Sequence, residues 1–137
     1  MRLGLFLATL IGLAGVSDAY AMSPSVADFP EFTDCPQAKG TWWAGGKEAE
    51  KYAPGHNMLL AVKEGRLFYA NDRSRGSMNE LKEVRWVQRV SGEIQIKTLS
   101  LSSFNLRKTG NIFTGYQDDG GTGGMPTIAN VEFVCGG

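Results

Sequence analysis

The sequence predicts an all-β protein, a small antiparallel β-barrel or sandwich of about eight short strands held together by one disulfide. Three observations predict it. Short runs of apolar and β-branched residues recur along most of the chain, and turn signals containing Gly separate them at nearly regular intervals. No segment has sustained helical periodicity. Finally, the only two cysteines lie near the two ends.

The first 21 residues have the parts of a secretory signal peptide. Met1-Arg2 supplies a positive start, and residues 3–15 form an unbroken apolar run. Ala19-Tyr20-Ala21 then offers small residues at the positions that a signal peptidase reads. Because a membrane span takes roughly 20 apolar residues, we expect cleavage after Ala21 and no membrane span. The expected location is secreted, either extracellular or, in a bacterium, periplasmic.

The remainder divides into a leader, residues 22–39, and a single β domain, residues 40–137. The leader contains three prolines and no clear period, and we expect it to become ordered near Cys35. Gly40–Ala44 is the first candidate strand, because its Thr and two Trp residues favour extended backbone. Residues 45–56 follow as a long loop.

Three pairs of candidate strands flank short loops that contain Gly, as the strands of β-hairpins do. These pairs are 58–62 with 66–70, 81–90 with 93–100, and 104–108 with 112–117. In the candidate strand 93–100, Ile94 and Ile96 alternate with polar residues, which is the period of a strand with one solvent-exposed face. A polar connector (71–78) and a Gly-rich loop (118–124) separate the hairpins, and 128–135 is the last strand.

Cys35 and Cys135 have only each other as a partner within the chain, and the expected compartment is oxidising. A zinc site would need further Cys or His ligands nearby, and nothing marks a Cys–His nucleophile. We therefore expect a structural disulfide, with no metal and no cofactor.

Composition narrows the class of function. The 137 residues include 14 basic and 14 acidic side chains, so the net charge is zero, and we expect no nucleic-acid partner. The single histidine, His56, has no nucleophile motif beside it. A secreted hydrolase or ribonuclease-like enzyme that pairs His56 with Glu93 or Glu132 is kept as a lower-ranked alternative. The favoured expectation is a protein that is not an enzyme.

Aromatic and arginine side chains are the best candidates for a contact surface. Adjacent residues of a strand point to opposite faces, so one of Trp42 and Trp43 lies outside the core, and the same choice applies to Phe68 and Tyr69. Arginines cluster between residues 66 and 89. We expect binding through five residues, Trp43, Tyr69, Arg73, Arg75 and Trp86.

Gly40-Thr41-Trp42 resembles the G-x-W opening of lipocalin-type barrels, in which the Trp closes the base of the barrel. The match covers this tripeptide, and the strand count and the signal peptide agree with it. The resemblance implies a small barrel and an alternative function, the carriage of a small apolar ligand. Trp42, Phe68 and Trp86 would then line the cavity.

The favoured hypothesis is a small secreted interaction protein that binds a protein partner. Its profile resembles that of small microbial effectors that act on hosts: a signal peptide, a short mature chain, one disulfide and no catalytic motif. An inhibitor of a foreign enzyme is a special case, in which loop 71–78 or loop 118–124 enters the target's cleft.

Overall fold

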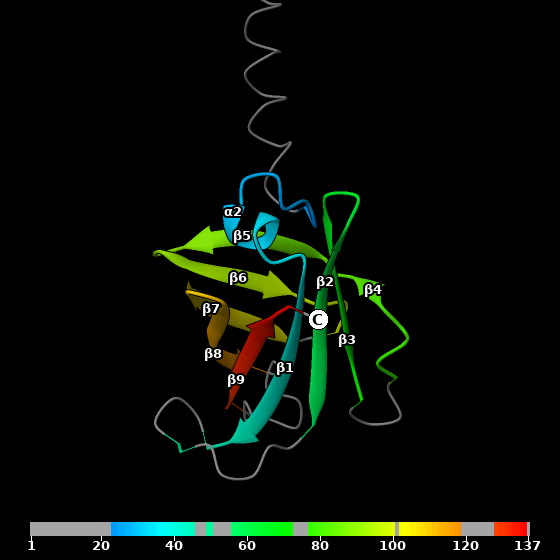
Figure 1. Ribbon diagram of the computed structural model, residues 1–137. Coiled ribbons are helices and arrows are strands. Elements are labelled where there is room, and N and C mark those ends of the chain that lie inside the picture. Colours follow the sequence, from blue (N-terminus) through cyan, green and yellow to red (C-terminus); the bar gives the residue numbers. More distant parts are fainter. Residues whose placement is uncertain are drawn as a thin grey trace, which may run out of the picture.

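One antiparallel sheet of nine strands forms almost the whole fold and curls into a half-barrel (Figure 1). The structure is a computed structural model that describes residues 23–45, 49–50, 56–72, 77–100, 102–118 and 128–136. The predicted all-β class is confirmed. The predicted signal peptide, Arg73, Arg75 and all but the first residue of loop 118–124 lie outside the described residues. In the described part of the chain, no helix has the length and apolarity that a membrane crossing requires.

Each predicted strand has a counterpart in the sheet. The strands are β1 (Gln37–Ala44), β2 (Asn57–Lys63), β3 (Arg66–Asn71), β4 (Lys82–Glu83), β5 (Trp86–Val90), β6 (Glu93–Lys97), β7 (Ser103–Thr109), β8 (Ile112–Asp118) and β9 (Ile128–Cys135). Their order across the sheet is β4-β3-β2-β1-β9-β8-β7-β6-β5. The first and last long strands are therefore neighbours in the middle of the sheet, and β4 and β5 are its edges.

Two of the hairpins depend on turns with positive φ at both central residues. Glu64 and Gly65 have φ values of 53° and 75°, and Ser91 and Gly92 have values of 50° and 80°. This pattern matches the right-handed twist of the flanking strands. Each turn places Gly second, where positive φ has no steric cost.

The segment 81–90, predicted as one strand, is divided at Val84 and Arg85. The backbone N–H of Val84 donates to the carbonyl of Leu67 near the start of β3. The next N–H, that of Arg85, donates to Lys97 at the end of β6. The chain thus changes its pairing partner at this point, and the bend brings the two edges of the sheet together.

The leader covers one end of the curled sheet (Figure 1). Its four-residue helix α2 (Pro30–Thr33) starts with a proline, which suits the first turn because that position needs no N–H donor. Phe32 is buried and stacks on Phe113 of β8 with ring centroids 5.1 Å apart. Phe29, just before the helix, is buried beside it. The leader is therefore part of the hydrophobic core.

Large side chains from both walls of the sheet fill its interior. Those with less than 2% of their surface exposed are Phe32, Met58, Leu60, Leu67, Ile94, Ile96, Phe104, Leu106, Phe113, Val131 and Phe133. All except Phe32, which lies in α2, follow the two-residue alternation of their strands, so every second strand residue faces inward. We call this side the inner face and the opposite side the outer face.

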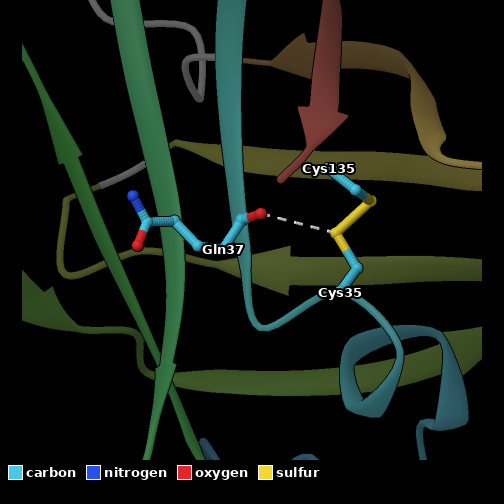
Figure 2. The surroundings of a disulfide bond; sticks show 3 residues. All are labelled: Cys35, Gln37 and Cys135. Carbon is cyan, nitrogen blue, oxygen red and sulfur yellow. Dashed lines mark hydrogen bonds between the residues drawn. A yellow bond between two sulfur atoms is a disulfide. The ribbon is translucent and has the colours of Figure 1, made fainter. Parts of the chain in front are cut away.

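The predicted disulfide between Cys35 and Cys135 is present and joins the second residue after α2 to the end of β9 (Figure 2). The two Cα atoms are 5.4 Å apart, within the usual range for a disulfide. The Sγ atom of Cys35 also lies 3.7 Å from the carbonyl oxygen of Gln37 (Figure 2). Because a disulfide sulfur carries no hydrogen, we treat this approach as a van der Waals contact.

Candidate functional site

A cavity of about 220 Å³ opens beside the edge of the sheet at β4. It forms there because β4 pairs only with Phe68 and Tyr69, while β3 continues to Asn71. Across the gap, β6 ends at Lys97 and the following residues are irregular. The cavity is lined by Tyr69, Ala70, Asn71, Ser77, Glu80, Lys82, Glu83, Val84, Thr98, Leu99 and Ser100. We call this the edge cavity.

Tyr69 connects the edge cavity to the core. Its ring lies 5.3 Å from that of Phe104, centroid to centroid, and packs against the core cluster. Phe68 is next to it on the same strand and therefore points to the outer face. Of the two aromatic candidates on β3, Tyr69 is thus the inward one, and it forms an apolar floor beneath the cavity.

Hydroxyl groups make the wall opposite Tyr69. Thr98 is buried, and its hydroxyl lies 3.0 Å from the Ser100 hydroxyl and donates to the carbonyl of Ser102 at 3.2 Å. Leu99, between them in sequence, has 57% of its surface exposed. The hydrogen bonds therefore hold this short turn in a shape that presents an apolar side chain at the rim.

Charged residues border the edge cavity on the β4 side. Lys82 pairs with Tyr69 across the strands and so shares its face. Glu83 is on the other face, where its carboxylate accepts a hydrogen bond from Arg66 at 3.3 Å. The cavity thus combines an aromatic floor, hydroxyl groups and a lysine, which suits a side chain that is partly apolar and partly polar.

Trp43 and Trp86 lie on the outer face, away from the edge cavity. Trp43 is half-buried, and its indole N–H donates to the carbonyl of Ala49 at 3.3 Å. Trp86 is half-buried on β5, opposite Lys97. The three described candidates therefore do not form a single surface, since Tyr69 lines the cavity and the two tryptophans belong to strands five places apart in the sheet.

His56 lies at the start of β2, where its ring faces that of Trp42 with centroids 4.8 Å apart. The nearby Asp72 carboxylate accepts hydrogen bonds from the backbone and side-chain N–H groups of Asn57, at 2.9 and 3.1 Å. These bonds, and to a smaller degree the charge of His56, lower the pKa of Asp72. Glu93, in contrast, accepts a hydrogen bond from Arg107. The position of His56 is therefore explained by the stacking of its ring on Trp42 next to the first residue of β2.

The described residues contain no group of three or more His, Cys, Asp or Glu side chains that could hold a metal ion.

Comparisons with known proteins found no matching family model, no matching curated protein and no matching solved structure. Any functional argument therefore rests on the chemistry of this chain alone.

Sequence reasoning did not identify most of the edge cavity. Thr98 and Ser100 fell inside a predicted strand, 93–100, whereas β6 ends three residues earlier. Lys82 was part of the predicted strand 81–90, with nothing to mark it as a cavity residue. Thr98 and Ser100 were the available signal. If the strand continued past Lys97, its alternation would direct these two polar side chains to the same inner face as Ile94 and Ile96.

Proposed function

We propose that this chain is a small secreted protein that is not an enzyme and acts by binding a protein partner at the edge cavity. The observation that carries the proposal is the filled interior of the half-barrel. A carrier needs a hollow interior, whereas here aromatic and aliphatic side chains from both walls meet in the middle. The edge cavity lies outside this filled interior, at the edge of the sheet, and is open to receive a group.

The edge cavity has the composition of an anchoring pocket in a protein interface. Such interfaces are dominated by a few residues that fill well-packed pockets, surrounded by contacts that exclude water. Tyr69 offers a rigid aromatic floor, and Leu99 adds exposed apolar area at the rim. An inserted side chain of a partner would gain most of its binding free energy from this floor.

Secretion is part of the proposal. The first 21 residues have the pattern of a signal peptide, and a disulfide between distant cysteines is stable only in an oxidising compartment. Together these features support a role outside the cytoplasm, as a host-directed effector or as an inhibitor of a foreign enzyme.

A site-specific photocrosslinker tests the proposal. It would replace Leu99 at the cavity rim or, as a matched control, Thr114, which is exposed on the outer face of β8. The protein is then incubated with extracts of candidate host or competitor cells. We expect one protein to crosslink from position 99 and not from position 114.

Native mass spectrometry of the protein from its own secretory source supplies the opposing outcome. A bound small molecule that leaves on denaturation, with no protein crosslinked from position 99, would contradict the proposal and favour the carrier.

A further inference from the structure

The outer face carries a continuous row of uncharged side chains that crosses six strands. Directly paired residues place Gln88 opposite Gln95, Gln95 opposite Asn105, Asn105 opposite Tyr116, Tyr116 opposite Asn130, and Asn130 opposite Trp43. Their sequence neighbours are core residues, among them Val87, Ile94, Phe104 and Val131. Strand alternation therefore directs the whole row outward. We call it the amide row.

The accessible part of the amide row lies on β5, β6, β7 and β8. Gln88, Gln95, Asn105 and Tyr116 are each half-buried, whereas Asn130 is 6% exposed. Trp86 is two residues before Gln88 on the same strand, so its ring lies on the same face. With strands about 4.8 Å apart, the four accessible positions span roughly 14 Å.

The row has no charge, and the charges beside it are paired. Arg107 and Glu93 form an ion pair at 3.3 Å on one side, and Lys97 and Asp118 on the other side also have interaction partners. A surface of this kind offers no electrostatic attraction to a nucleic acid or to an acidic or basic peptide.

Hydrogen-bonding capacity is the property that the row offers instead. Each carboxamide carries two donors and an acceptor. The Gln88 amide donates to the Gln95 oxygen at 2.7 Å, which orients both groups. Among the described residues, the oxygen of Gln88 and the amide N–H groups of Gln95 have no further side-chain partner, so both remain available to a ligand.

We infer that the amide row binds a linear, neutral oligosaccharide. Sugar hydroxyls are both donors and acceptors and so match carboxamides, while the apolar face of a sugar ring packs on an aromatic ring such as that of Trp86 or Tyr116. A peptide backbone also offers donors and acceptors to carboxamides, so the aromatic rings on the same face are the feature that favours a sugar. This function is distinct from the edge cavity and does not depend on it.

The inference is tested on residues 22–137, the chain expected after cleavage of the signal peptide. This protein is titrated with cellohexaose, chitohexaose and maltohexaose, and binding is followed by tryptophan fluorescence and calorimetry. A sulfated hexasaccharide serves as the charged comparison. We expect saturable binding of at least one neutral probe. Gln95→Ala and Asn105→Ala should each weaken it about fivefold, and Trp86→Ala about tenfold. Thr114→Ala, in a flanking position of β8, should leave it unchanged.

The inference would be overturned by no binding of any neutral probe at millimolar concentration, by tighter binding of the sulfated probe, or by equal affinities in the row variants and the Thr114 control. Far-UV circular dichroism establishes that each variant is folded. A dimer in sedimentation that Gln95→Arg dissociates would assign the row to self-association and would also overturn it. The sugar titration does not involve position 99. A failure to crosslink a protein from that position would therefore contradict the proposed function and leave this inference unaffected.

Discussion

Gly40 is a point in the middle of the sheet where an aromatic ring lies directly against the backbone. It pairs directly with Phe133 across β1 and β9. A Cβ atom at position 40 would lie 2.5 Å from the Cδ2 and Cε2 atoms of the Phe133 ring. Without that atom, the ring covers β1 and meets Phe104 edge-on at a centroid distance of 5.7 Å. Core packing therefore requires glycine here.

Gly40→Ala should destabilise the protein by about 1–3 kcal/mol, because the Phe133 ring must move out of a filled core. Urea denaturation measures the change as a lower midpoint at constant slope. In a Phe133→Leu background the smaller side chain leaves room, so Gly40→Ala should cost at least about 0.5 kcal/mol less there. Equal costs in the two backgrounds would show that the ring is not the cause.

At the same scale, the sequence predicts that neighbouring aromatic residues on a strand face opposite sides, and it cannot predict which one faces inward. Trp42 packs against the core and Trp43 does not, and on β3 the inward residue is Tyr69. These choices depend on the register of strands far apart in sequence. For the same reason the edge cavity and the amide row become visible only after the strands are paired.

Helix α2 is attached to the sheet by an ion pair and a ring contact. The Arg89 guanidinium donates two hydrogen bonds of 3.0 Å to the Glu31 carboxylate. It also lies 5.1 Å from the centre of the Phe29 ring. The hydrogen bonds from Arg89 hold the pKa of Glu31 below its ordinary value. The pair connects the leader to β5, at the edge of the sheet.

Glu31→Gln should lower the free energy of unfolding by about 0.5–1 kcal/mol at pH 7, since the pair is partly exposed. The folded-state pKa of Glu31 is below the unfolded value near 4.5. The stabilisation is therefore complete above that value and disappears as the pH falls through the lower folded-state pKa. Urea midpoints of the two proteins should differ at pH 7 and converge as the pH falls below the folded-state pKa of Glu31.

Asp34→Asn, at the other end of α2, is the matched control, because the described residues give Asp34 no ion pair. A difference between Glu31→Gln and the natural sequence that persists undiminished at low pH would contradict the assignment of the stabilisation to the charged carboxylate.

Elements differ in how well the sequence predicts them. The hairpins were predicted correctly, because their turns need Gly and their strands alternate. The division of segment 81–90 was not, since the change of partner from β3 to β6 depends on the curvature of the whole sheet. Helix α2 was missed because four residues are too few to show a helical period.

Taken as a whole, the molecule has its first and last long strands side by side in the middle of the sheet. β1 and β9 pair over seven residue positions, from Ala38 with Cys135 to Ala44 with Ala129. The disulfide lies at the α2 end of this pair (Figure 2). Strand pairing and the covalent bond therefore act on the same long loop, which contains nearly the whole domain. If that end opens, the contacts among the leader, β1 and β9 are lost at the same time.

The double variant Cys35→Ser, Cys135→Ser should be destabilised by up to about 4.7 kcal/mol, the chain-entropy value for a loop of about 100 residues. A domain of this size has a total stability of about 5–15 kcal/mol, so the variant is expected to be marginal at 37 °C. Hydrogen exchange at low temperature should speed up most at the backbone amides of Phe32 and position 135, because in the natural protein the disulfide holds that end closed, and least at Ile96. A urea midpoint equal to that of the natural protein, or exchange accelerated evenly across the sheet, would show that strand pairing alone closes this end.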